Sequence, residues 1–246
     1  MSPSPFCAII VFVRCRTVPA RKARAGKESQ MNNKEKKEAA ASKEKPTLMQ
    51  EIISWVEVIV TAVVIALLLT QFIIINARVP SGSMQDTIQP GDRLFGLRLT
   101  YLFSEPKRGD IVVFRYPVDD ALGHKTNYIK RIIGLPGETL EIRDARIYIN
   151  GSDTPLDEPY LREEWVERND GITFKIPEGC YVMLGDNRNN SSDSRYWHDV
   201  ALRDFMMEGK EITEEEAVQL QFVPRNKILG KAYVRYWPIT QISVVK

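Results

Sequence analysis

The sequence predicts a mainly β domain that follows a single transmembrane helix. Two observations support this prediction. Residues 58–77 form a run of twenty residues without a charged side chain, rich in Ile, Val and Leu. After residue 77, short segments rich in Val, Ile, Tyr and Phe alternate with turns that contain Gly, Pro or Asp, a pattern typical of short β-strands. The 246 residues are enough for one domain of good size plus an anchor.

Charge is distributed unevenly along the chain, although the net charge is only +2. Residues 1–50 carry 11 Lys and Arg against 4 Asp and Glu, and we expect this basic tail, low in aromatic residues, to be disordered. A basic segment before an apolar span favours a cytoplasmic tail. Residues 77–246 carry 23 basic and 26 acidic residues, so no basic excess suggests nucleic-acid binding. Either Met1 or Met31 could be the true start.

Residues 51–76 form the predicted anchor. Twenty helical residues cover about 30 Å, the thickness of the bilayer hydrocarbon, and Trp55 lies where indole favours the interface. A cleaved signal peptide is the alternative, and the small residue Ala77 near the end of the run fits it. The apolar region of a signal peptide is, however, only about 7–15 residues long. We therefore expect a retained single-pass anchor, with residues 77–246 on the extracytoplasmic face of the cell membrane.

The elements after the anchor are predicted to be short strands, with one helix. Residues 140–149 are expected to form two strands around a tight turn, followed by a turn at Asn150 and Gly151. Thr213 and Glu216 match the capping box of a helix over 213–222. The other predicted strands cover residues 93–99, 110–116, 128–133, 172–176, 181–184 and 232–237.

The chain contains only three cysteines and two histidines. Cys180 is the one cysteine after the anchor, so we expect no disulfide there and interpret Cys180 as a packed hydrophobic residue rather than a nucleophile. His124 and His198 do not form a metal-binding spacing, so we expect no metal and no cofactor. We expect His198 to be a surface residue.

Ser83 is the strongest candidate nucleophile because the anchor holds it near the membrane. The seven residues from Asn76 to Ser83 reach at most about 25 Å. A serine hydroxyl attacks a carbonyl only if a base removes its proton, and no histidine is a plausible base. Lys130 could serve, because Ile129 and other apolar neighbours would lower the pKa of a buried lysine. From spacing alone, a structural lysine at the edge of a strand is an equally good interpretation.

Four blocks of sequence resemble the conserved motifs of bacterial type I signal peptidases. The resemblance runs in order from about residue 50 to the C-terminus, and the single apolar span is more like the single-anchor enzymes of Gram-positive bacteria than the two-span enzymes. It implies a β catalytic domain with a small second β lobe at about 136–180. It also implies removal of signal peptides from secretory preproteins. The blocks are residues 80–84 (PSGSM), 107–114 (KRGDIVVF), 128–131 (YIKR) with 134–138 (GLPGE), and 185–195 (GDNRNNSSDSR).

The resemblance implies a role for each matched polar residue. Ser83 matches the nucleophile and Lys130 the general base. Ser81 matches the hydroxyl that forms the oxyanion hole with the Ser83 backbone N–H, although it could be a turn residue. Ser191 matches the hydroxyl that orients the lysine, although it could be one of several serines in its loop.

Further matched positions are expected to shape the site. Asp193 and Arg195 match a pair that we interpret as structural, and we expect Asp186 to shape a turn. The substrate is expected to bind as an added strand. Four residues match positions that line a pocket for a small side chain, which implies cutting after Ala-x-Ala; they are Val79, Met84, Tyr128 and Ile129.

The sequence departs from the family pattern in two places. Asp86 stands where the family often has proline. Residues 198–222 exceed the few residues expected there, and we interpret them as a surface insertion with a short helix and an unknown partner.

Two other classes of function were weighed. A self-cleaving Ser/Lys repressor would need a DNA-binding domain before the catalytic one, which residues 1–47 do not provide. An inactive, membrane-tethered binding protein would have no reason to keep Ser81, Ser83, Lys130 and Ser191 together. Ser42 and Lys45 also fit a Ser-x-x-Lys spacing, which we attribute to chance in a charged tail.

Overall fold

The computed structural model describes residues 47–85, 87–161, 163–166 and 169–245. The predictions for Asp86 and for most of the tail 1–50, including Met31, Ser42 and Lys45, lie outside the described residues. The chain divides into two compact units, with the boundary between Ile59 and Val60. This boundary falls inside the first described helix.

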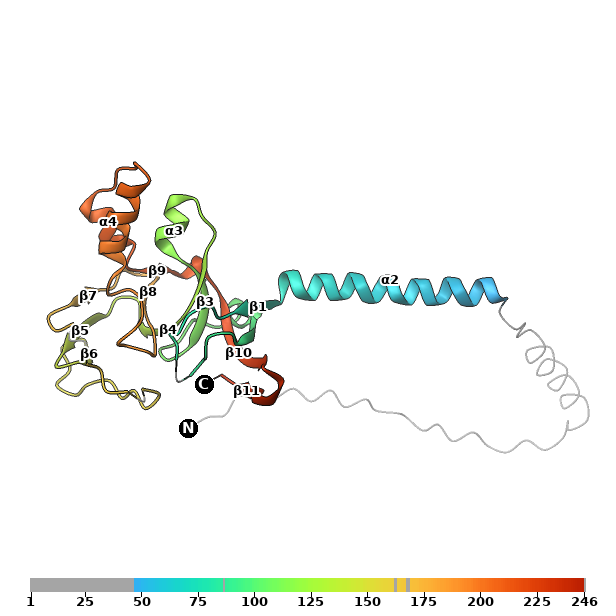
Figure 1. The fold of residues 1–246 in the computed structure, drawn as a ribbon, viewed down its shortest axis with the longest axis horizontal. Helices are drawn as coiled ribbons and strands as arrows, with labels where there is room; N and C mark the ends of the chain where they lie inside the picture. The colour runs from blue at the N-terminus through green and yellow to red at the C-terminus, as the bar shows by residue number, and fades with distance from the viewer. Residues whose placement is uncertain (1–46, 86, 162, 167–168, 246) are drawn as a thin grey trace, which may run out of the picture. The chain divides into compact units, whose positions relative to one another are not determined.

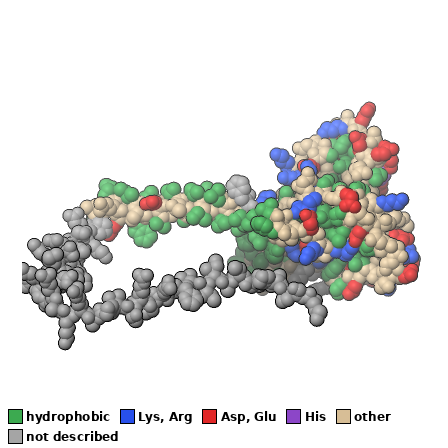
Figure 2. Space-filling view, turned by 180° about the vertical axis from the view of Figure 1, so that it is seen from behind, with side chains coloured by type: hydrophobic (Ala, Val, Ile, Leu, Met, Phe, Trp, Pro, Cys, Tyr) green, Lys and Arg blue, Asp and Glu red, His purple; other side chains and the backbone are tan. Residues whose placement is uncertain are grey.

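Helix α2 runs from Leu48 to Phe72 (Figure 1). Its segment Leu48–Thr70 has a mean hydropathy of 2.7 and is long and apolar enough to cross a membrane. Figure 2 shows hydrophobic side chains along this helix and few charged ones. The predicted anchor extended to residue 76, and its end is corrected here, because residues 74–78 form strand β1. Its backbone groups pair with strand β2 instead of continuing the helix.

The main sheet is antiparallel in every pair described and has the order β1-β2-β10-β3-β4-β8-β9, with β11 also paired to β10. The predicted strands occur near their expected positions, except that β10 begins four residues early, at Ile228 rather than at residue 232. Strand β1 was missed because its isoleucines were counted in the anchor. The bounds are β1 Ile74–Arg78, β2 Arg93–Leu97, β3 Ile111–Arg115, β4 Asn127–Gly134, β8 Cys180–Leu184, β9 Val223–Pro224, β10 Ile228–Trp237 and β11 Ser243–Val244.

A second, three-stranded sheet has the order β6-β5-β7. It comprises β5 (Thr139–Arg143), β6 (Arg146–Ile149) and β7 (Thr173–Lys175), within the range expected for the small lobe. The two residues between β5 and β6, Asp144 and Ala145, both have positive φ, as a two-residue hairpin turn requires. The inner side chains of this sheet pack against Ile133, Val182 and Leu184 of the main sheet.

Among the described residues, three short helices follow α2, where the sequence predicted one. Helix α5 (Glu214–Gln219) is the predicted helix, and its capping box is formed by Thr213 and Glu216. Helices α3 (Pro117–Leu122) and α4 (Trp197–Met207) were not predicted. They lie side by side (Figure 1). The remaining short elements are the 3₁₀ turns η1 (Leu99–Leu102), η2 (Arg225–Lys227) and η3 (Ile239–Gln241).

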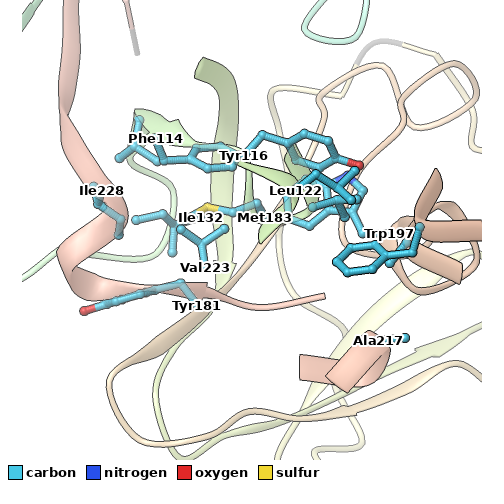
Figure 3. Packing of buried hydrophobic residues seen from close by; sticks show 14 of the residues in the cluster. Phe114, Tyr116, Leu122, Ile132, Tyr181, Met183, Trp197, Ala217, Val223 and Ile228 are labelled. Atoms are coloured by element: carbon cyan, nitrogen blue, oxygen red, sulfur yellow. The ribbon is translucent and has the colours of Figure 1, made fainter. Parts of the chain in front are cut away.

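The segment 198–222 is more than a surface insertion. The buried side chains of α4, Trp197, Ala201 and Phe205, recur every four residues, the spacing of one helix face. They join Phe114, Tyr116, Met183 and Ala217 in one hydrophobic core against the main sheet (Figure 3). The Tyr116 ring stacks on Tyr128 with centroids 4.2 Å apart, so this core supports a residue predicted to line the substrate pocket.

Candidate active site

Ser83 lies in a tight loop between β1 and β2. The ends of the loop are joined by hydrogen bonds from Val79 N–H to the Asp92 carbonyl at 3.0 Å and from Gly91 N–H to the Val79 carbonyl at 2.8 Å. Inside the loop, Ile88 N–H donates to the Met84 carbonyl at 2.8 Å. The side chains of Met84 and Ile88 are buried beneath it. Because the buried side chains of Met84 and Ile88 hold the loop in place, they restrict the motion of the backbone that carries the Ser83 hydroxyl.

Lys130 lies on β4, opposite Val112 of β3. Its side chain is buried, and Lys130 Nζ lies 2.5 Å from Ser83 Oγ. The structure therefore brings together the predicted nucleophile and base, which are 47 residues apart in the sequence.

The surroundings of Lys130 favour the neutral amine. Burial lowers the pKa of Lys130 to about 8, whereas the carboxylates of Asp193 and Asp186 act in the opposite direction and Arg195 assists the lowering. With a pKa of about 8, roughly a tenth of the molecules carry a neutral amine at pH 7, against fewer than about one in a thousand for an ordinary lysine. Lys130 can therefore act as a base at neutral pH.

The two predicted supporting serines differ in their contacts. Ser81 Oγ lies 3.4 Å from Ser83 Oγ, beside the hydroxyl that would attack. Ser191 is buried and close enough to Asp193 to help lower its pKa. Among the described residues, however, Ser191 Oγ has no partner with normal hydrogen-bond geometry, and no hydrogen bond joins it to Lys130. The predicted hydrogen bond from Ser191 to Lys130 is therefore absent among the described residues.

The other serines of the 185–195 loop have different environments. Ser194 Oγ accepts a hydrogen bond from Met183 N–H, and Ser192 lines the open cleft described below. Of these three serines, only Ser191 is both buried and without a hydrogen-bond partner for its hydroxyl among the described residues. The assignment of Ser191 as the residue that orients Lys130 stays a prediction.

A cleft of about 420 Å³ opens beside Ser83 and Lys130. It contains all four predicted pocket residues, Val79, Met84, Tyr128 and Ile129, together with Ser81, Ser83 and Lys130. Sequence reasoning did not identify the remaining lining residues, which include Arg78, Thr126, Asn127, Asn190 and Ser192.

Asp193 and Arg195 form a fully buried ion pair, and Asp193 also accepts a hydrogen bond from Gly185 N–H at 3.0 Å. Burial alone would raise the pKa of Asp193, but the Arg195 guanidinium and these hydrogen bonds lower it below its ordinary value. The carboxylate therefore remains ionised beneath the site, as a structural pair requires.

Asp186 does more than shape a turn, so that prediction is corrected. Its carboxylate binds the Arg131 guanidinium through two hydrogen bonds of 2.8 and 2.6 Å, and both side chains are buried. It also accepts a hydrogen bond from the Thr87 hydroxyl at 2.6 Å. Because Arg131 follows Lys130 on β4, Asp186 compensates the charge beside the proposed base.

Asn187 and Gly185, which the sequence did not single out, fix the loop against the nucleophile. Asn187 donates from its backbone N–H to the Ser83 carbonyl and from Nδ2 to the Gly82 carbonyl, both at 3.1 Å. A Cβ at Gly185 would lie 2.4 Å from the Ser83 carbonyl oxygen and 2.2 Å from Ser191 Oγ. Only glycine allows this close approach. The presence of Gly185 at the start of the matched block 185–195 was the signal that could have identified it.

The histidines and Cys180 have no part in the cleft lining. His198 pairs with Asp199 and Glu214, and the hydrogen bond to Asp199 contributes most to raising its pKa. Burial raises the pKa of the Cys180 thiol, which disfavours the reactive thiolate. In the described ranges, no three His, Cys, Asp or Glu side chains cluster as metal ligands.

Comparison with known proteins shows the family. Residues 52–237 match the family model described as signal peptidase, peptidase S26. The chain is 36% identical over 197 residues to probable signal peptidase I-2 of Synechocystis sp., covering 78% of each chain. It is 32% identical over 206 residues to signal peptidase I of Leptolyngbya laminosa, covering 80% of this chain and 86% of that protein. A solved signal peptidase I of Enterococcus faecalis aligns with 52% of this chain and 97% of its own, at 31% identity and a TM-score of 0.35.

The match of the family model includes residues 52–72 of α2, the Ser83 loop, β4 and the 185–195 loop. The chain belongs to the signal peptidase family, peptidase S26.

Proposed function

We propose that this protein is a membrane-tethered serine endopeptidase that removes signal peptides from secretory preproteins by a Ser83–Lys130 mechanism. The observation that carries the proposal is the buried Lys130 amine, 2.5 Å from Ser83 Oγ at the wall of a cleft. An inactive binding protein would gain nothing from a lysine whose pKa burial lowers to about 8, because a buried amine costs stability.

Acylation begins when the neutral Lys130 amine accepts the proton of the Ser83 hydroxyl. Ser83 Oγ forms a bond to the carbonyl carbon of the scissile peptide, and the carbonyl oxygen gains the negative charge. The Ser81 hydroxyl and the Ser83 N–H donate to that oxygen, and such donors are often worth about 3–4 kcal/mol. When the C–N bond breaks, the Lys130 ammonium gives its proton to the leaving amine.

Deacylation repeats the same proton transfers with water. Lys130, now neutral again, takes a proton from a water molecule that attacks the acyl-Ser83 ester. The bond between Ser83 Oγ and the acyl carbon breaks, and the proton returns to Ser83. One base therefore serves both half-reactions.

The cleft offers two strand edges to a substrate. In the described sheets, β1 pairs only with β2, and residues 127–130 of β4 pair only with β3, because β8 meets β4 from Arg131 onward. The end of β1 and this part of β4 both border the cleft. An extended signal peptide can add to these edges, with a small residue beside Met84 and Ile129, which would select Ala-x-Ala sequences.

The anchor supports a reaction at the membrane surface. Helix α2 is long and apolar enough to span the bilayer, and the basic segment before it favours a cytoplasmic N-terminus. From Phe72 to Ser83 the chain reaches at most about 40 Å, so the hydroxyl stays near the extracytoplasmic leaflet. A preprotein presents its cleavage site just after its own apolar segment.

The direct test is cleavage of a preprotein by the purified full-length protein in lipid vesicles. We expect one cut after an Ala-x-Ala sequence, mapped by mass spectrometry, and no cut with Ser83→Ala. A variant that begins just before Ile74 preserves β1 and should cut short peptides while cutting membrane-inserted preproteins less efficiently. If the shortened variant cut membrane-inserted preproteins as efficiently as the full-length protein does, the role of the anchor would be refuted. Absence of the cut by the wild-type protein would refute the proposed activity.

A further inference from the structure

In the described part of the chain, three arginine–carboxylate pairs are buried around Ser83 and Lys130, and the carboxylate of one of them comes from outside the site motifs. Two pairs connect residues of the matched motifs. The third connects the 185–195 loop to the segment between β6 and β7, in the small lobe. The pairs are Arg131–Asp186, Arg195–Asp193 and Arg188–Glu158.

Glu158 is the centre of the third pair. Its carboxylate accepts two hydrogen bonds from the Arg188 guanidinium, at 2.9 and 2.5 Å, and one from the Tyr160 hydroxyl at 2.5 Å. The side chain of Glu158 is 8% exposed and that of Arg188 is 3% exposed. Burial by itself would lower the pKa of Arg188, but the Glu158 carboxylate reverses the effect and raises it. The Arg188 guanidinium therefore remains charged in the folded protein.

One line of contacts runs from Glu158 to the nucleophile. Arg188 donates from Nε to the Gly185 carbonyl at 3.1 Å. Gly185 in turn lies so close to the Ser83 carbonyl and to Ser191 that no side chain fits between them. Movement of Arg188 would therefore move the backbone that supports Ser83.

A second line runs from Glu158 to the base. The Arg131 guanidinium lies over the Tyr160 ring, 3.8 Å from its centroid, and Tyr160 is held by its hydrogen bond to Glu158. Arg131 is the residue after Lys130 on β4. The same carboxylate thus restrains the backbone on both sides of the catalytic hydrogen bond.

We propose that Glu158 and Tyr160 are positioning residues for the Ser83–Lys130 pair. This inference rests on the proposed function of that pair. Both residues act through Arg188 and Arg131 and do not line the cleft, so they set the geometry of the reacting atoms rather than contact the substrate. A shift of about 1 Å transmitted from a remote site can reduce a rate by about a hundredfold.

The test compares Glu158→Gln with Asp157→Asn in the full-length protein. Asp157 is the exposed neighbour of Glu158, so its substitution removes the same charge from the same segment. For Glu158→Gln we expect kcat on an Ala-x-Ala peptide to fall at least about tenfold, with KM unchanged. Loss of Glu158 also leaves Arg188 as an uncompensated buried cation, so the acidic limb of the pH profile should move to lower pH.

Tyr160→Phe is the second variant, because it keeps the ring under Arg131 and removes only the hydroxyl. We expect it to fold as the wild type does and to lose about fivefold in kcat, so it decides the matter if Glu158→Gln does not fold. The inference is overturned if Glu158→Gln keeps the kcat and pH profile of Asp157→Asn. If Glu158→Gln does not fold, the inference is overturned when Tyr160→Phe keeps the kcat and pH profile of Asp157→Asn. Activity of Ser83→Ala would instead refute the proposed function, so the two failures are distinguishable.

Discussion

The charged pairs in two regions of this protein have different environments. Around Ser83 and Lys130, the ion pairs Arg131–Asp186 and Arg195–Asp193 have side chains that are no more than 3% exposed. In the helical segment 197–222, the pairs are more exposed. The side chains of Lys210 and Glu208 are 45% and 34% exposed, and both histidines pair with carboxylates of the same segment.

The same kind of ion pair therefore contributes differently to stability in the two regions. In water, an ion pair adds little stability because solvent screens the charges and the side chains lose freedom. Away from water, loss of one partner leaves a charge that nothing compensates. The buried pairs hold the 185–195 loop and β4 beside Ser83 and Lys130, whereas the helical segment is held by its apolar face, with Trp197, Ala201 and Phe205 in the core.

The largest effect is expected when the catalytic pair itself is removed. Ser83→Ala and Lys130→Ala should each reduce kcat/KM on a preprotein by at least about a thousandfold, because neither group has a substitute in the cleft. Because the two residues act as a unit, the double variant should be no worse than either single one. A sizeable residual activity in Lys130→Ala would contradict the assignment of the base.

Breaking a buried pair should cost much of the stability. Arg195→Met removes the cation that compensates Asp193, and we expect the free energy of unfolding to fall by about 3–5 kcal/mol, measured by urea denaturation. The matched exposed variant is Lys210→Met, which should change stability little. Equal effects of the two variants would remove the distinction between the regions.

The pH dependence of activity tests the burial of Lys130. The base must be neutral, and its pKa is lowered to about 8 by burial, so kcat/KM should rise with pH up to about 8 and then level off. Below that value it should fall about tenfold per pH unit, as the fraction of neutral amine falls. A rise that continues towards pH 10 would mean that Lys130 behaves as an exposed lysine.

A smaller effect is expected at the cap of α5. Thr213→Ala removes the hydroxyl that accepts the Glu216 N–H, and we expect a loss of about 1 kcal/mol in the free energy of unfolding. Activity should be unchanged at temperatures where the protein is folded, because α5 does not contribute to the cleft. A loss of activity without a loss of stability would connect the helical segment to catalysis.

The smallest effect is expected for His124→Gln, which removes the exposed pair with Glu208. Thermal unfolding and peptide cleavage should both match the wild type at pH 6 and pH 8, because solvent screens the pair at either pH. A clear pH-dependent loss of stability in His124→Gln would show that the pair of His124 with Glu208 stabilises the fold despite its exposure to solvent.

Local patterns in the sequence determined much of the fold and the prediction of Ser83 and Lys130 as nucleophile and base. Strands at 111–115 and 139–149, the capped helix α5 and the apolar span all followed from the spacing and type of neighbouring residues. The scarcity of histidine directed attention to Lys130, and the matched motifs removed the alternative of a structural lysine. Helix α4 could also have been predicted from Trp197, Ala201 and Phe205, but only three apolar positions carried the signal.

Only the tertiary structure decided which charges meet. Glu158 lies 30 residues from Arg188, and Asp186 lies 55 residues from Arg131, with no local pattern that connects either pair. The end of α2 was decided in the same way, because residues 74–78 become a strand only when β2 supplies their hydrogen bonds. A buried ion pair is strong only where remote elements exclude water from it, and that exclusion is a property of the assembled fold rather than of any segment of the sequence.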